Sequence, residues 1–169
     1  MKSLGAAMGS DRAGLNDNPA AADPLATRRL RLWIRMLGVT RQIENRLREY
    51  LRVEHDTTLP RFDVMAMLHR RSEGLTMSEL SRMLLISNGN ATAVVNRLVQ
   101  DGMVERILSD EDRRRVSVRL TPEGAEFFDL LASDHLQMIG GLLSELDDQD
   151  LDRMRDTFRR LRDSLSAAG

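Results

Sequence analysis

The sequence predicts a mainly α-helical protein that carries one small β-hairpin, and three observations lead to this prediction. Apolar residues recur at spacings of three and four along most of the chain, as they do on amphipathic helices. Proline and capping residues mark several helix starts. Two short β-like runs, 103–108 and 116–120, follow one another, and in the second Val116, Val118 and Leu120 alternate with polar side chains, as on a strand. A length of 169 residues suits one domain with additional helices.

Composition narrows the class of protein further. Hydrophobic residues make up 41% of the chain and aromatic residues only 4%, so the core must consist of Leu, Val, Ile and Met. The absence of cysteine excludes disulfides and thiolate metal sites. The first 22 residues lack the apolar segment of a signal peptide, and no apolar run is long enough to span a bilayer. We therefore expect a cytoplasmic protein that does not contact a membrane.

Charge is distributed unevenly along the chain. Residues 1–122 carry 20 basic and 15 acidic side chains, whereas residues 123–169 carry 5 and 11. Almost every cation is arginine, since Lys2 is the only lysine. Arginine offers a planar set of donors that suits phosphate and base edges, so a net charge of −1 does not exclude a nucleic-acid partner. Genomic codon bias is the alternative explanation for the arginines.

The N-terminal part is expected to hold one long helix behind a flexible tail. Residues 1–22 are rich in Gly, Ala, Asn and Asp, which favours a flexible segment. Asp23 and Pro24 form a helix-start signal. The segment 23–59 is then predicted to be helical as far as about Val53, on the spacing of Leu30, Ile34, Leu37, Ile43, Leu47 and Leu51, with Trp33 alongside.

Residues 60–122 are expected to form a lobe of three short helices and the hairpin. Pro60 opens the first helix and Gly74 ends it. Thr76 and Glu79 fit a capping box that starts the second, and Ser87 is the expected N-cap of the third. The expected inward residues are Phe62, Met65 and Leu68 on the first helix, Leu80, Met83 and Leu84 on the second, and Ala91, Val94, Val95 and Leu98 on the third. Gly102 then stops the third helix before the strands.

Residues 123–169 are expected to form two more helices. One starts at Thr121 and Pro122 and runs to about Leu143, and the other starts at Asp147. Their apolar residues exceed what one small lobe can cover, so a second copy of the chain is the expected partner. The residues concerned are Phe127, Leu130, Leu131 and Leu136, and then Leu151, Met154, Phe158, Leu161 and Leu165.

Two short helices at a tight break, followed by a hairpin, are the parts of a winged helix-turn-helix, whose second helix enters the major groove of DNA. Steps of 100° along the helix from Ser87 to Gln100 place Gly89, Ala93, Asn96 and Gln100 outward, flanked by Asn90, Thr92 and Arg97. Small residues let the backbone approach closely, and Asn and Thr pair with base edges. No Asp or Glu occurs from Leu80 to Gln100, which an approach to phosphate requires. A purely structural bundle or an interface patch is the alternative.

Three adjacent arginines, Arg113, Arg114 and Arg115, follow three acidic residues between the two strand-like runs. A hairpin directly after a DNA-reading helix projects beside the duplex, where an arginine at its tip can enter the minor groove. Asp110 or Asp112 would pair with one arginine and fix the loop. An ordinary charged turn is the alternative.

The stretch from Leu75 to Gly124 resembles the MarR family of bacterial transcriptional regulators. Its "DRR…LTxxG" signature is present as Asp112-Arg113-Arg114, followed by Leu120-Thr121 and Gly124. By this resemblance Arg114 matches the minor-groove arginine, and Asp112 and Arg113 match residues that structure the wing. Ser87, Asn88, Asn90, Thr92 and Arg97 lie on the matched recognition helix. Ala93 departs from the long polar or basic residue that is frequent at its position.

The resemblance also implies an obligate homodimer on a pseudo-palindromic operator, acting as a repressor and released by a small molecule. The effector would be an aromatic acid or its coenzyme A thioester, bound between the dimer helices and the DNA-binding lobe. Candidate contacts are Trp33, Met65, His69 and Arg28, each of which is also explained as an ordinary core or surface residue.

Two other classes of function are less well supported by the sequence. The three histidines form no metal-binding motif, and no phosphate loop or nucleophile elbow is present, so we expect no catalytic site, metal or cofactor. A helical dimeric interaction protein whose winged domain no longer binds DNA remains the alternative.

Overall fold

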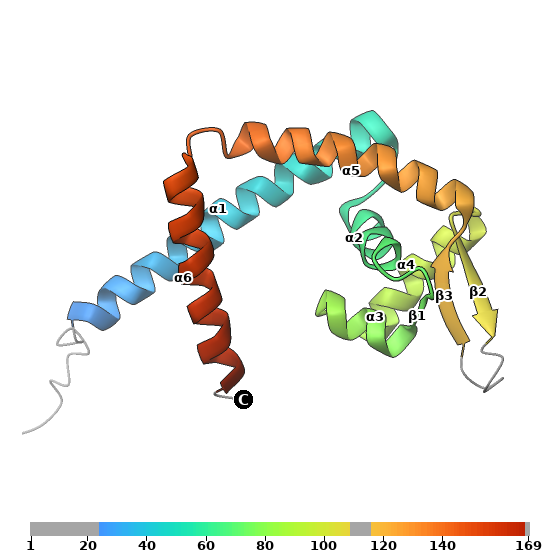
Figure 1. The fold of residues 1–169 in the computed structure, drawn as a ribbon, viewed down its shortest axis with the longest axis horizontal. Coiled ribbons are helices and arrows are strands. Elements are labelled where there is room, and N and C mark those ends of the chain that lie inside the picture. Colours follow the sequence, from blue (N-terminus) through green and yellow to red (C-terminus); the bar gives the residue numbers. More distant parts are fainter. Residues whose placement is uncertain (1–23, 109–115, 168–169) are drawn as a thin grey trace, which may run out of the picture. The chain divides into compact units, whose positions relative to one another are not determined.

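A computed structural model gives the fold and describes residues 24–108 and 116–167 (Figure 1). Residues 1–41 and 42–169 form two compact units, and the first helix runs across the boundary between them. The helices are α1 Pro24–His55, α2 Leu59–His69, α3 Met77–Leu84, α4 Asn88–Gln100, α5 Pro122–Leu142 and α6 Asp148–Ala167. The strands are β1 Leu75–Thr76, β2 Val104–Leu108 and β3 Val116–Leu120. The predicted mainly α-helical fold with a β-hairpin is confirmed.

The sheet has one strand more than the sequence predicts. Its order is β1-β3-β2, and both pairings are antiparallel. β2 and β3 form the expected hairpin, with Val104 opposite Leu120 and Leu108 opposite Val116. β1 pairs Leu75 with Val118 on the far edge of β3. Since α3 begins directly after β1, this short strand joins the helical part of the lobe to the hairpin.

Two glycines adopt the left-handed backbone that other residues avoid. Gly74 (φ +88°) turns the chain into β1, where an added Cβ would lie 2.9 Å from the carbonyl oxygen of Val118. Gly102 (φ +74°) turns the chain from α4 into β2. Leu85, between α3 and α4, has φ 55° although it is not glycine, and 91% of its surface is exposed.

The core lies in residues 42–169, where α2, α3, α4, α5 and the sheet meet around apolar side chains. Val64 and Met65 of α2 and Leu80 of α3 are fully buried, as are Val95 and Leu98 of α4. Full burial of one such side chain contributes about 1.5–3 kcal/mol. This lobe therefore has a closed interior that holds α4 in a fixed place against α2 and α3.

One expected inward position, Met83, is exposed, and two apolar core residues of the helices, Val64 and Phe128, were not predicted. Met83 is 40% exposed, so its assignment to the buried face of α3 was wrong. Leu130 and Leu136 of α5, which were expected to need a partner, are 54% and 73% exposed. Phe128 occupies the core face of α5 instead, at 7% exposure. Spacings of three and four define a stripe but leave its phase open when apolar residues are adjacent, as at Phe127 and Phe128.

Large apolar side chains are also exposed on the first and last helices, α1 and α6. In α1, on residues 24–41, these are Leu25, Leu30, Leu32, Trp33, Ile34 and Val39. In α6 they are Leu151, Met154, Phe158, Leu161 and Leu165. None of the described helices combines the length and apolar character that crossing a membrane requires.

Candidate nucleic-acid interface

α3 is anchored at its start by the predicted capping box. The backbone N–H of Glu79 donates to Thr76 Oγ1 at 3.3 Å, and the Glu79 carboxylate accepts from the Thr76 backbone N–H at 2.8 Å. These two bonds satisfy donors that the first turn of a helix leaves unpaired. The prediction of this helix start from Thr76 and Glu79 is confirmed.

The turn from α3 into α4 is short and closed by hydrogen bonds. The Ile86 backbone N–H donates to the Ser81 carbonyl oxygen at 3.1 Å. Ser87 caps α4, since its hydroxyl oxygen accepts from the Asn90 backbone N–H at 3.2 Å. The Ser81 hydroxyl also bonds to the Asn88 side-chain oxygen across the turn. Ser87 and Asn88 thus fix the geometry by which α4 leaves α3.

The outer face of α4 consists of the residues that the sequence placed there. Ala91, Val95 and Leu98 are fully buried, and Gly89, Ala93, Asn96 and Gln100 are exposed. Asn90 and Arg97 are exposed beside them, and Thr92 is half-buried with its hydroxyl donating to the Asn88 carbonyl oxygen at 2.8 Å. Apart from Arg97, the side chains of this face are small or polar and uncharged, and none of them is a carboxylate.

The first acid after α4 has its own partner. Asp101 lies 2.5 Å from Arg61 Nη1, at the start of α2. A carboxylate at a helix C-terminus faces the negative end of the helix dipole, and the Arg61 guanidinium offsets this repulsion. The pair also connects α2 to the end of α4, so it orients α4 and reduces the negative potential beside it.

Sequence reasoning missed one arginine next to α4. Arg106 of β2 donates from Nη2 to Asn96 Oδ1 at 2.6 Å. The alternation of β2 could have found it, because Val104 and Arg106 share a face and Val104 is buried at 2% exposure. On the opposite face, Glu105 accepts from Arg119 Nε at 2.7 Å.

The proposed wing residues fall beyond the described part of the chain. Asp112, Arg113, Arg114 and Arg115 lie outside the described residues. β2 and β3 bring the two ends of this segment together, at Leu108 and Val116. The structure therefore gives the position from which the segment leaves the sheet.

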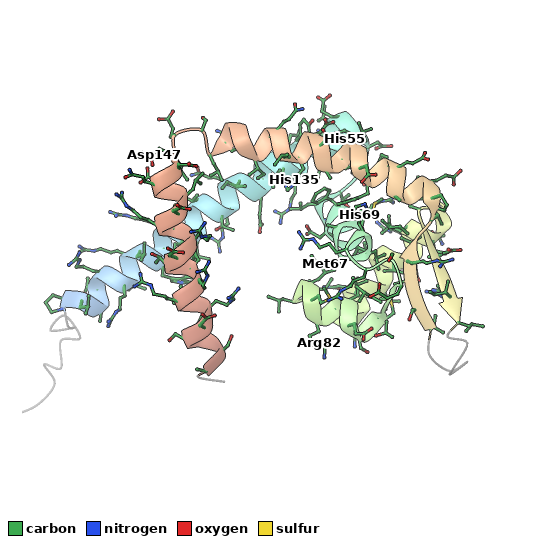
Figure 2. All side chains as sticks on the ribbon, viewed as in Figure 1. His55, Met67, His69, Arg82, His135 and Asp147 are labelled. Carbon is green, nitrogen blue, oxygen red and sulfur yellow. The ribbon has the colours of Figure 1, made fainter. Side chains whose placement is uncertain are left out.

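The candidate effector contacts are divided between the two compact units. Met65 is fully buried in the core of the lobe, where packing alone accounts for it. His69 lies on α2 (Figure 2). Its Nε2 lies 3.1 Å from Asp129 Oδ1 of α5, and its ring packs on Phe128 at a centroid distance of 4.8 Å. Trp33 and Arg28 belong to the other compact unit, where both are exposed on α1.

Another histidine lies where α2 meets α5. His135 lies on α5 (Figure 2). Its ring packs on Phe62 at a centroid distance of 4.5 Å. Burial lowers the pKa of the His135 imidazole. Within the described residues, no group of three or more His, Asp or Glu side chains could hold a metal ion.

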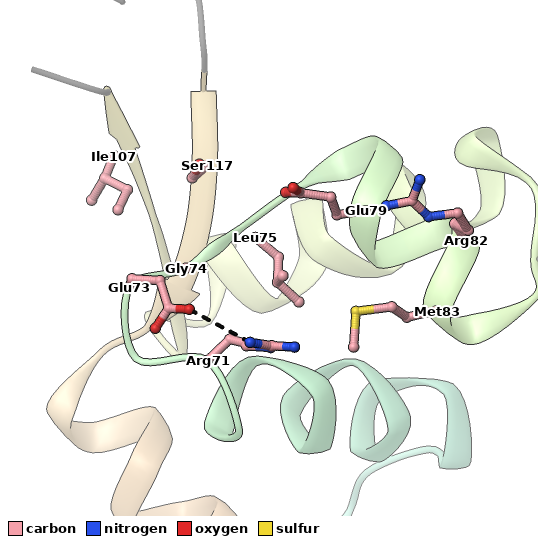
Figure 3. Close-up of a pocket in the computed structure, with 9 residues that line it drawn as sticks. All are labelled: Arg71, Glu73, Gly74, Leu75, Glu79, Arg82, Met83, Ile107 and Ser117. Carbon is pink, nitrogen blue, oxygen red and sulfur yellow. Dashed lines mark ion pairs between the residues drawn. The ribbon is translucent and has the colours of Figure 1, made fainter. Parts of the chain in front are cut away.

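A hollow of about 480 Å³ lies between β1, the hairpin and α3 (Figure 3). Its charged side chains have both signs, and Arg71 lies 4.0 Å from Glu73 across one side. Two arginines, Arg71 and Arg82, and two carboxylates, Glu73 and Glu79, line the hollow, so it has no excess of one charge to hold an ion. The lining residues are Arg71, Glu73, Gly74, Leu75, Glu79, Arg82, Met83, Ile107 and Ser117.

A capped α3, a tight turn, an exposed α4 and a hairpin on the same lobe define a winged helix-turn-helix protein. The family model described as MarR family matches residues 55–115. A MarR family transcriptional regulator from Silicibacter pomeroyi has a similar crystal structure, with a TM-score of 0.73 and 31% identity over 85% of this chain and 99% of that one. This chain belongs to the MarR family of transcriptional regulators.

Other relatives agree. A mutant MarR from E. coli complexed with operator DNA superposes with a TM-score of 0.70 and 25% identity, covering 82% of this chain and 99% of that one. The regulator PecS of Dickeya dadantii is 28% identical over 106 residues, which are 62% of this chain and 64% of PecS. The alignment thus spans just under two thirds of PecS. These relatives regulate transcription, and the expectation that the chain is not an enzyme is confirmed by its family.

Proposed function

We propose that the protein regulates transcription by binding a pseudo-palindromic operator as a homodimer. The observation that carries this proposal is the outer face of α4, which is exposed, free of carboxylates, and made of small and amide side chains. Such a face can enter the major groove closely and hydrogen-bond to base edges. The residues assigned to DNA are Ser87, Asn88, Asn90, Thr92, Asn96 and Arg97, with Arg113, Arg114 and Arg115 on the wing.

The proposal divides the chain by role. Residues 60–122 bind DNA, and residues 23–59 and 123–169 form the dimer. Residues 1–22 are an N-terminal tail. The exposed apolar side chains of α1 and α6 support this division, because contiguous apolar surface marks an interface. A two-fold dimer would set its two α4 helices about 34 Å apart, one turn of DNA.

The protein would repress transcription in the cytoplasm. An aromatic acid or its coenzyme A thioester would bind to the protein and relieve this repression. Support comes from α1, where Arg28, Arg29, Arg31 and Arg35 line one hollow with Leu25 and Leu32, a surface suited to an anionic ligand. A coupling of about 1–3 kcal/mol would release the operator in part. Fluorescence polarisation of the protein–operator complex, titrated with such compounds to millimolar concentration, tests this; unchanged affinity would contradict the effector class.

The proposal is tested by placing a charge on α4. Ala93→Glu sets a carboxylate at the centre of the outer face, where it would meet phosphate and base oxygens. A like-charge contact costs several kcal/mol, so operator affinity should fall about 100-fold or more. Gln149→Glu adds the same charge on α6 and retains the acceptor that bonds to Arg153, so it serves as the control.

Both variants should melt like the parent, because Ala93 and Gln149 are exposed. The duplex is first selected from a randomised library with the parent protein, and affinities are measured by fluorescence anisotropy. Equal affinity of Ala93→Glu and parent would contradict the assignment of α4. A dimer that selects no duplex would favour a winged interaction protein that does not bind DNA.

A further inference from the structure

Arg106 and Asn96 belong to different elements, yet their side chains meet at the outer face of α4. Residues alternate between the two faces of a strand, so Arg106 projects from β2 on the same side as the buried Val104. That side of β2 packs against α4. Arg106 Nη2 donates to Asn96 Oδ1 at 2.6 Å, a short hydrogen bond with a charged donor.

The neighbouring charges leave Arg106 available for this role. Glu105 points to the other face of β2, where it accepts from Arg119 at 2.7 Å. Among the described residues no carboxylate lies within ion-pair distance of Arg106. Its guanidinium therefore bonds to a neutral amide and keeps a full positive charge beside α4.

The chemistry of the two groups fixes which way the Asn96 amide faces. A guanidinium only donates hydrogen bonds, so the amide must turn its oxygen to Arg106 and its NH₂ group away. The cation also polarises the amide, which weakens its oxygen as an acceptor for a second partner and strengthens its N–H donors. An unrestrained asparagine instead reads adenine with oxygen and nitrogen together.

We propose that Arg106 is a positioning residue for sequence reading, which holds Asn96 so that it presents donors to the DNA. The inference depends on the proposed function. Asn96 would then favour a base pair that offers acceptors in the major groove, such as O6 and N7 of guanine or O4 of thymine. Specificity at this base pair would belong to α4 and β2 jointly.

The test is a double-mutant cycle on DNA. Affinities of the parent, Asn96→Ala, Arg106→Ala and the double variant are measured for the selected duplex and for all single base-pair changes in one half-site. Asn96→Ala should lose about fivefold to 100-fold discrimination at one base pair. Arg106→Ala should lose discrimination at that same base pair, and the double variant should discriminate no less there than Asn96→Ala.

Arg119→Ala is the matched control, since it removes an exposed arginine from the adjacent strand on the other face of the hairpin. It should leave discrimination at the Asn96 base pair unchanged. A loss that is equal for all sequences in Arg106→Ala would show a phosphate contact and overturn the inference. Loss at a different base pair, or no base-specific effect of Asn96→Ala, would overturn it as well.

A measurement without DNA separates this inference from the proposed function. The side-chain NH₂ resonances of Asn96, assigned by their loss in Asn96→Ala, should shift and sharpen towards free-asparagine values in Arg106→Ala but not in Arg119→Ala. Unchanged resonances would show that Arg106 does not hold Asn96. If these shifts occur but the parent selects no duplex, then the proposed function fails, and the role in reading fails with it.

Discussion

Asp63 of α2 shows how one partly buried acid sets a pH dependence of stability. Burial raises the pKa of its carboxyl, and Glu44 raises it further while Arg48 lowers it. The folded state thus holds the proton more tightly than the unfolded chain, whose aspartate pKa is about 3.9. Ionised Asp63 therefore destabilises the fold at neutral pH, and this penalty disappears as the pH falls towards the unfolded value.

Asp63→Asn should accordingly raise the melting temperature at pH 7. The gain should shrink as the pH is lowered towards about 4, because the parent residue then becomes neutral as well. Circular dichroism melts at several pH values check this. Asp163→Asn, at an exposed position of α6, should give no such pH-dependent gain. A destabilised Asp63→Asn at pH 7 would mean that the carboxylate makes a favourable contact.

Single residues also show where sequence reasoning about the site succeeds. The outward positions of α4 follow from helix geometry and three buried neighbours, so Ala93 and Asn96 could be placed in advance. The hydrogen bond from Arg106 to Asn96 joins β2 to α4, which are separated by a turn. No local sequence pattern predicts such a contact between two elements. Met65 is apolar, which suits either a ligand contact or a core residue. Only the fold shows that it is fully buried in the core.

At the scale of elements, the start of α5 depends on a close approach of two backbones. Thr121 caps the helix by accepting from the Gly124 N–H at 3.0 Å, and its hydroxyl donates to the Gly102 carbonyl oxygen at 2.7 Å. These bonds draw α5 onto the end of α4, and a Cβ on Gly124 would lie 2.0 Å from the Met103 carbonyl oxygen. The threonine and glycine of the LTxxG signature therefore join α5 to the lobe.

Gly124→Ala should destabilise the protein by about 1–3 kcal/mol or more, because the backbone must move to admit the methyl group. Gly140→Ala, in the same helix, meets nothing within 4 Å and should be neutral or stabilising by about 0.5–1 kcal/mol. Urea unfolding monitored by circular dichroism measures both. Equal stability of the two variants would contradict the close approach.

Local signals explain which elements could be predicted. Caps at Thr76, Ser87 and Thr121 lie within three residues of the groups they bind, so they are legible in sequence and all three are present. β1 was missed because two residues have no periodicity, and its partner Val118 is distant along the chain. The exposed Leu130 and Leu136 belong to stripes whose covering surface one chain does not supply.

For the whole molecule, the decisive feature is the apolar stripe of α6. Its five large apolar residues are each at least 44% exposed, and no residue of the described helix is buried. Phe158→Glu should convert a dimer into a monomer or an aggregate, because a carboxylate would enter an apolar contact. Sedimentation equilibrium measures the association constant, and Gln149→Glu on the opposite side of α6 should leave it unchanged. A dimer of undiminished stability in Phe158→Glu would place the interface elsewhere.

Leu85 is a suitable position for a label that reports the distance between two subunits. Its side chain is almost entirely exposed on the backbone turn that links α3 to α4, and the chain contains no cysteine. A cysteine at this position would be the only thiol in each subunit, so one nitroxide per subunit could be attached without altering any other residue. Pulsed electron paramagnetic resonance would then measure the distance between the two labels of the proposed homodimer. The distances would be recorded with and without operator. The comparison would show how widely the separation of the two labelled turns varies in the free protein, and which of these separations the operator binds.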